Sequence, residues 1–278
     1  MPHPQRWRTP YEAGWDRSGA ANVERVGSLA RPAVEWSEFG RPVRRFRRLI
    51  VHTATARDGA CWTAAKRAEL EIFAVRNGWA TEASEQAGEV LDYVPFESRS
   101  QIFVATPVDD PSKPVGVARM IWGDSVLPMD EQFLVTSMHT IEPEWTWMLN
   151  HVGFERVAEW ATLGAVGSNL SPMFALWSAA YRTARARGVD YWVQSVVEEL
   201  FSVYRDGFKT PMMQIGGREI VVGAESIPTM LPLEEIGVGR MLAWNGSLKR
   251  SLFGPWVDRR SPESDDDDLS DLSGCGDW

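Results

Sequence analysis

The chain has 278 residues, of which 44% are hydrophobic and 24% are charged, so it is long enough to bury a sizeable core. Its two cysteines, Cys61 and Cys275, exclude a disulfide framework and a four-cysteine zinc site. No apolar run approaches the roughly 18–20 residues that cross a bilayer, and the first residues lack the apolar segment of a secretory signal. We therefore expect a cytoplasmic protein without a membrane span.

The net charge of −9 is concentrated at one end of the chain. Residues Ser261–Trp278 hold seven acidic side chains and no Lys or Arg, which leaves the rest of the chain at −2. A Ser- and Asp-rich block buries too little apolar surface to order itself, so we predict a disordered acidic tail over residues 256–278. Because the remainder is not basic, we expect no nucleic-acid partner.

Residues 1–60 show little periodicity and are rich in Arg, Gly and Pro, so they are predicted to form a partly irregular extension. Five arginines fall within eight residues of this part, and they form either a solvated arm or a dock for an acidic partner. They are Arg41, Arg44, Arg45, Arg47 and Arg48.

From Thr63 to about Trp79 the pattern turns helical, with Glu69 placed outside the apolar face and Asn77-Gly78 as the stop. The runs Gln101–Ala105 and Pro114–Ile121 then predict a hairpin. Ser171-Pro172 is typical of a helix start, and Ser171 is better explained as a cap than as a nucleophile. The other predicted elements are a β-like run Phe133–Met138, a helix Glu142–Phe154, a strand Val157–Val166, a strand Asp190–Val197, a short helix Glu198–Arg205, and β-like runs Arg218–Val222 and Thr229–Leu233. This order predicts an α/β sandwich around one mixed sheet.

Two charged residues interrupt apolar strand-like runs. Arg119 shares a face with Val117 and Ile121, and Glu159 shares one with Val157 and Leu163, since side chains alternate along a strand. A charge on an apolar face is costly to bury unless it is paired or hydrogen-bonded. The two residues therefore form either a structural ion pair across neighbouring strands or part of a site with a chemical role.

Short motifs are spread over about residues 63–235. They are Arg76 and Trp79 on the early helix, Asp92-Tyr93 before the hairpin, Gly116-Val117-Ala118-Arg119 in it, Leu127-Pro128-Met129-Asp130-Glu131-Gln132-Phe133 after it, then Glu159 and Tyr204-Arg205-Asp206-Gly207-Phe208. With the element order, they resemble the GNAT acyltransferases, and among these the acyl-homoserine-lactone autoinducer synthases and the long-chain N-acyl amino acid synthases. The resemblance implies a three-layer fold with a central mixed, mostly antiparallel sheet, and places a GNAT-like domain at residues 61–255.

The resemblance also implies an activity. It is transfer of an acyl group, in this family a fatty acyl group, from acyl-ACP or acyl-CoA to the amine of a small acceptor such as an amino acid or a homoserine-lactone-like compound. Glu159 would be the general base or part of the proton path. Arg119 and Asp92 would shape the acceptor pocket, with Arg119 holding an acceptor carboxylate. The alternative for Asp92 is a solvated loop acid or a helix cap.

The donor contact would fall on Thr162 and on the turn Gly167, Ser168 and Asn169, whose amides would lead toward a phosphopantetheine phosphate. Two departures from the family stand here: Thr162 replaces the expected Arg, and the phosphate-binding loop is reduced to Val166-Gly167-Ser168-Asn169. No metal is implied. An acidic carrier protein would suit the five arginines of residues 41–48.

Two other functions stay open: a GNAT-shaped protein that has lost catalysis and binds a ligand or partner, and an acetyl-CoA-dependent acetyltransferase of small amines. Phe174, Leu176 and Trp177 are better explained as core than as an acyl tunnel. No role is assigned to the histidines, which show neither metal-ligand spacing nor an obvious nucleophile partner. They are His3, His52, His139 and His151.

Overall fold

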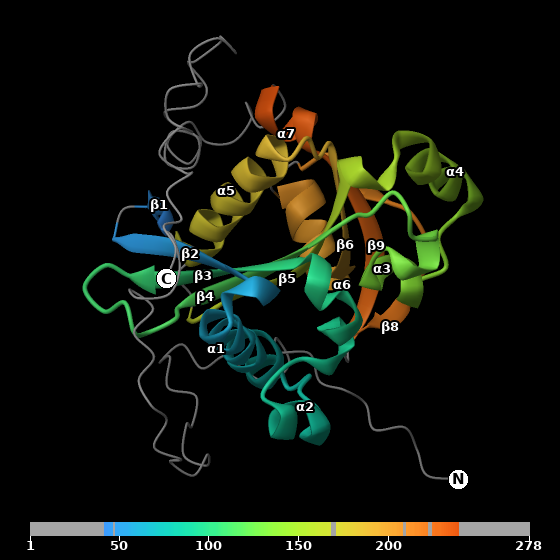
Figure 1. The fold of residues 1–278 in the computed structure, drawn as a ribbon. Coiled ribbons are helices and arrows are strands. Elements are labelled where there is room, and N and C mark those ends of the chain that lie inside the picture. Colours follow the sequence, from blue (N-terminus) through green and yellow to red (C-terminus); the bar gives the residue numbers. More distant parts are fainter. Residues whose placement is uncertain (1–41, 47, 168–170, 208–209, 222–223, 239–278) are drawn as a thin grey trace.

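The computed structural model describes residues 42–46, 48–167, 171–207, 210–221 and 224–238 (Figure 1). The predicted acidic tail therefore lies outside the described residues, as do Arg41, Arg47, Ser168, Asn169 and Phe208.

One mixed sheet of nine strands forms the centre of the described part of the chain. Its order is β1-β2-β3-β4-β5-β6-β9-β7, with β8 paired to β9 away from this path, and β5–β6 is the one parallel pair among them. The α/β class with a mixed, mostly antiparallel sheet is thus confirmed. The strands are β1 (Pro42–Phe46), β2 (Leu49–Thr55), β3 (Ser100–Pro107), β4 (Gly116–Trp122), β5 (Val157–Ala165), β6 (Tyr191–Val197), β7 (Met213–Gln214), β8 (Glu219–Val221) and β9 (Ala224–Pro232).

Helices cover both faces of this sheet and complete three layers (Figure 1). The long helix α5 (Ser171–Ala186) lies on one face, and α1 (Ala60–Glu69), which continues as a π-helical segment η3 (Leu70–Val75), lies on the other. The remaining helices are α2 (Glu82–Ala87), α3 (Leu134–Met138), α4 (Pro143–Val152), α6 (Glu198–Ser202) and α7 (Leu233–Val238), with short turns η2 (Ala56–Asp58), η4 (Leu91–Arg99), η5 (Met129–Glu131), η6 (Phe154–Arg156) and η7 (Val203–Gly207).

The core under α5 is built around tryptophans. The ring of Trp160 packs edge-on against Trp192 at 4.5 Å and against Trp177 at 5.8 Å between ring centroids. Leu176 is fully buried in the same cluster, so this part of α5 is core, as the sequence predicts. Such aromatic pairs are worth about 0.5–1.5 kcal/mol each beyond the apolar area they bury.

The predicted extension over residues 1–60 lies partly outside the described residues, and its described part contains β2, which pairs with β3 along its whole length, and β1 at the sheet edge. In the sequence the short β-branched run of β2 directly follows the arginines of residues 41–48, so its strand pattern is difficult to recognise. The predicted β-run Phe133–Met138 is helix α3, because Phe133 N–H binds Thr136 Oγ1 at 3.2 Å and the first-turn amides find an acceptor on β5.

A β-bulge in β5 shifts the register of its pairing with β4. Arg119 pairs with Thr162 whereas Met120 pairs with Trp160, so Ala161 is the extra residue. The bulge brings Thr162 to the sheet face that holds Glu159, three positions earlier. Leu163, predicted on the face of Glu159, packs instead against the α5 cluster.

Candidate active site

The parallel strands β5 and β6 form a fork. They pair over three residue pairs, from Val157 with Tyr191 to Glu159 with Val193. Both strands are described in full, and β5 continues to Ala165 without further pairing to β6. Strands that part in this way leave backbone N–H and C=O groups facing the gap, where an extended ligand can bind them.

Glu159 sits at the last paired position of the fork and is 1% exposed. Its Oε2 accepts the N–H of Leu134 at 2.7 Å and its Oε1 that of Val135 at 3.0 Å. Burial raises the pKa of Glu159 to about 8, although both amide bonds and the charge of Arg99 act in the opposite direction. Glu159 therefore anchors α3 to the sheet and changes its charge close to neutral pH.

Arg119 is paired with Glu69 rather than with Glu159. Its Nε donates to Glu69 at 2.9 and 3.1 Å and its Nη2 donates at 2.5 Å, and both side chains are at most 1% exposed. Thr162 Oγ1 donates to the same carboxylate at 2.8 Å. The predicted ion pair between Arg119 and Glu159 is therefore wrong.

Tyr93 closes this buried network from η4. Its hydroxyl donates to the carbonyl of Ala161, the bulge residue, at 2.8 Å and lies 3.0 Å from Thr162 Oγ1. The guanidinium of Arg119 lies 4.7 Å from the centre of the Tyr93 ring. Burial is the main cause that raises the pKa of Tyr93, so the phenol stays protonated. Tyr93 therefore ties η4 to the bulge in β5.

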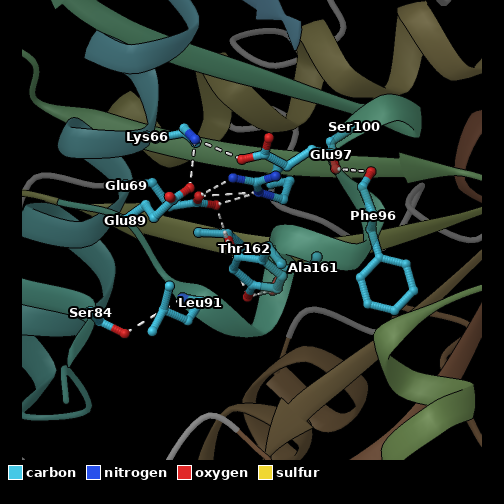
Figure 2. A network of polar contacts seen from close by, with 12 residues as sticks. Lys66, Glu69, Ser84, Glu89, Leu91, Phe96, Glu97, Ser100, Ala161 and Thr162 are labelled. Carbon is cyan, nitrogen blue, oxygen red and sulfur yellow. Dashed lines mark hydrogen bonds and ion pairs between the residues drawn. The ribbon is translucent and has the colours of Figure 1, made fainter. Parts of the chain in front are cut away.

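A second set of charges lies toward the outside of the same network. Lys66 Nζ donates to Glu89 at 2.5 Å and to Glu97 at 2.7 Å (Figure 2). The Lys66 side chain is 15% exposed, so water screens these pairs more than it screens Arg119 and Glu69. These ion pairs link Lys66 of α1 to Glu97 of η4 and to Glu89 just before it, and they lie outside the buried pair of Arg119 and Glu69.

A surface pocket of about 830 Å³ lies beside α3. Leu134 of α3 lines this pocket and donates its amide to Glu159, which is not part of the lining. Arg99 also lines it and donates to the carbonyls of Trp122, Gln132 and Glu131 at 2.8–2.9 Å. The acidic residues of the lining are Asp92, Asp124, Asp130 and Glu131.

The predicted site residues thus separate into three groups. Arg119 and Thr162 lie together, Glu159 lies at the fork, and Asp92 is exposed on the pocket rim. Arg119 does not line the pocket. Beyond the end of β5, Gly167 adopts φ +73°, a conformation that favours glycine, two residues after Ala165, the last position of β5 that pairs with β4.

The residue that sequence reasoning missed here is Glu69, which the helical pattern places outside the apolar face. It is fully buried, on the face that α1 and η3 turn to the sheet. The signal was its spacing, seven residues after Trp62 and three before Ile72, both of which are buried. An acid on an apolar helix face calls for a buried cation, and Arg119 supplies it.

Within the described residues no group of three or more His, Cys, Asp or Glu side chains is placed to hold a metal ion. The helices of the described part of the chain are also too short or too polar to cross a bilayer.

No protein-family model and no curated protein matches the chain. Solved structures similar to it include LasI, an AHL synthase (9% identity, TM-score 0.46, 74% of this chain and 95% of LasI). Others are BjaI, a CoA-dependent acyl-homoserine lactone synthase with SAM and isopentyl-CoA (11%, 0.45, 66% and 83%), and FeeM, an N-acyl amino acid synthase from uncultured soil microbes (18%, 0.42, 68% and 94%). These are the two groups that the motifs resemble, but at such identities and TM-scores the likeness assigns no activity to this chain.

Proposed function

We propose that the chain is an N-acyltransferase that moves an acyl group from a phosphopantetheine thioester, on acyl-ACP or acyl-CoA, to the amine of a small acceptor such as an amino acid. The observation that carries the proposal is the fork between β5 and β6, with the buried Glu159 at its apex. The unpaired edge of β5 offers amides and carbonyls to an extended arm, and this edge leads from Glu159 toward Gly167.

The donor would lie along this edge. Its amide-containing arm can bond to strand backbone as a further strand would, which holds the thioester beside Glu159. Residues 167–169, which the sequence predicts to form a turn, and the start of α5 come next along the chain, and backbone N–H groups there would favour a phosphate. Thr162 donates a hydrogen bond to Glu69, so it would hold the backbone of β5 in place rather than contact the donor itself.

The chemistry needs a proton acceptor for the incoming ammonium. With a pKa of about 8, Glu159 is mostly protonated at pH 7, and its carboxylate fraction grows as the pH rises toward 8. The carboxylate form can take up such a proton, because each of its oxygens keeps a lone pair beside its amide bond. The freed amine then attacks the thioester carbon, the C–S bond breaks, and the thiolate leaves with a proton. The positively charged amine is drawn to the pocket whose lining has four acids, among them Asp92, and one arginine.

The five arginines of residues 41–48 would bind an acyl carrier protein when it is the donor. Arg44 and Arg45 lie on edge strand β1, and Arg48 is exposed at its end. An edge strand with cationic residues can meet an acidic carrier, whose approach would depend on salt.

Mass spectrometry of lipid extracts from cells that overproduce the protein tests the proposal. We expect an N-acylated amine with the wild type that is lost with Glu159→Gln and kept with Glu155→Gln, an exposed acid of η6. Its mass names both acyl chain and acceptor. An acetylated amine would favour the acetyl-CoA alternative, whereas no new species from folded protein would contradict acyl transfer and favour a binding protein.

A further inference from the structure

A chain of hydrogen bonds on β6 joins a histidine to a serine outside the groups described so far. His139 follows the last residue of α3, and its Nε2 lies 2.9 Å from Ser195 Oγ on β6. Its Nδ1 lies 3.3 Å from the carbonyl oxygen of Gly217. On its other side, Ser195 Oγ lies 2.7 Å from Ser226 Oγ on β9. This is a base held by a third group and in contact with a hydroxyl nucleophile.

The protonation of the ring follows from its neighbours. A carbonyl oxygen can only accept, so Nδ1 carries the proton that binds Gly217. In the neutral ring Nε2 is therefore an acceptor directed at the Ser195 hydroxyl. Burial is the largest cause that lowers the pKa of His139, which keeps the ring neutral and basic at neutral pH.

The same chain also accommodates the charged ring. When His139 gains a proton from outside this chain of hydrogen bonds, Nε2 becomes a donor to Ser195 Oγ, and the Ser195 hydroxyl then donates to Ser226. Ser226 in turn donates to the carbonyl of Glu219, 3.4 Å away, which accepts the last hydrogen. Every polar atom of the chain thus keeps a partner in both protonation states, a property that a catalytic base needs.

The position of Ser195 links it to the fork. It lies two residues after Val193, which pairs with Glu159, and alternate residues of a strand share a face. Ser195 therefore faces the side of the sheet where Glu159 lies, on the part of β6 that has separated from β5. It is half-buried, whereas His139 is 6% exposed, so the nucleophile is more accessible than its base.

The ionisable groups around His139 favour this arrangement. The carboxylate of Glu219 on β8 acts on the ring and stabilises the imidazolium. From β5, Glu159 binds the first turn of α3 at the end opposite His139, and from η4, Arg99 is bound to backbone carbonyls. Ser137 and Met138, next to His139, line the pocket with Asp130 and Glu131 of η5.

We propose that Ser195 is an acyl-accepting nucleophile with His139 as its base, so that the protein forms a covalent acyl-serine. Ser195 Oγ bonds to the acyl carbon while the bond to the leaving group breaks, and the serine proton passes through His139 to the leaving atom. An amine or water then attacks the ester and gives a proton to His139, and His139 passes this proton to Ser195 Oγ as the bond between Oγ and the acyl carbon breaks. The first step needs neither thioester nor amine, so it can be tested apart from the proposed function.

The test uses the full chain with two serine-directed probes, p-nitrophenyl butyrate and an alkyl fluorophosphonate. We expect release of p-nitrophenolate from the ester, and from the fluorophosphonate one stable adduct that peptide mass spectrometry maps to Ser195. Ser195→Ala should abolish both. His139→Gln, which keeps hydrogen-bonding groups but no base, should slow the reaction with the ester about 100-fold or more. Ser112→Ala, an exposed serine of the loop between β3 and β4, should leave both unchanged.

Two further results distinguish a catalytic role of Ser195 from a purely structural one. Ser195→Cys should take the butyryl group as a thioester that neutral hydroxylamine removes, which a purely structural hydroxyl would not explain. An adduct on another residue, no adduct on folded wild type, or an unchanged rate in folded His139→Gln would overturn the proposal. Loss of acyl-serine with amide formation intact would leave the proposed function standing.

Discussion

At the residue scale, the buried charges are the main feature of this molecule. Glu69 and Arg119 bind each other through three hydrogen bonds, which leave Arg119 Nη1 without a hydrogen-bond partner among the described residues, and Glu159 is bound by two amides instead of a cation. Taking a charge from water costs several kcal/mol unless such partners are present. Each of these residues is therefore held in one geometry, and their replacement has different and measurable effects.

Removal of one partner of the buried pair should be strongly destabilising. Glu69→Gln leaves the Arg119 charge uncompensated, which costs about 3–5 kcal/mol in the free energy of unfolding. The double variant with Arg119→Met should recover most of that loss, because no buried charge remains. Urea unfolding of both single variants and the double variant measures the coupling, with Glu85→Gln on the exposed surface of α2 as the control. Additive losses would show that the pair is not coupled.

The raised pKa of Glu159 predicts a pH-dependent stability. A carboxyl whose pKa is about 8 when folded and near 4.5 when unfolded binds its proton more tightly in the folded state. Its contribution to stability is therefore complete below pH 4.5 and is lost as the pH rises to about 8. We expect the advantage of the wild type over Glu159→Gln in urea unfolding to shrink from pH 5 to pH 8. The same comparison for Glu155→Gln should stay flat, and a widening gap would contradict the assignment.

At the scale of elements, the sequence predicts the helices and the hairpin well and fails where an element depends on a distant partner. The hairpin β3–β4 and helix α5 follow from local periodicity, turn residues and caps. Helix α3 does not, since its apolar run suits a strand equally and its first turn is fixed by Glu159 on β5, 25 residues later. The bulge at Ala161 likewise arises from pairing and places Thr162 beside Glu69.

The packing of α5 on β4 gives a prediction about the donor end of the fork. A Cβ at Gly116 would lie 2.9 Å from Leu176 Cδ1 and 3.0 Å from Pro172 Cβ. Gly116→Ala should therefore displace the start of α5, at a cost of about 1–3 kcal/mol. We expect a lower urea midpoint and a higher KM for the acyl donor with little change in kcat. Gly217→Ala, where a Cβ meets nothing within 4 Å, is the matched control.

At the scale of the whole molecule, charge is distributed unevenly along the chain. The five arginines of residues 41–48 and the seven acids of Ser261–Trp278 carry opposite sign. Sequence reasoning identified both segments from composition alone, yet it could not place β1 and β2 in the sheet, because their pairing with β3 is a property of the assembled fold. The candidate site was found in the same partial way: Glu159 and Arg119 were named, whereas Glu69, His139 and Ser195 emerge from contacts across elements.

Removal of the acidic segment should change carrier binding if the segment competes for the arginines. We expect deletion of residues 261–278 to raise the affinity for an acyl carrier protein at low salt and to have little effect at high salt, since exposed charges are then screened. Titration calorimetry at two salt concentrations measures this. Replacement of the seven acids by Asn and Gln should match the deletion, and an affinity that does not change would contradict competition.

The short parallel seam between β5 and β6 also has a consequence for how the chain acquires its structure. On one side β1 to β5 are antiparallel neighbours in sequence order, and on the other β6 and β9 pair with β7 and β8 between them in sequence. Each half of the sheet can therefore form by pairing of strands that are close in sequence, at a low entropic cost of loop closure. The seam joins strands separated by all of α5, and it has three residue pairs to hold it. We therefore expect the two halves to meet last in folding, at the fork where we propose that acyl transfer takes place.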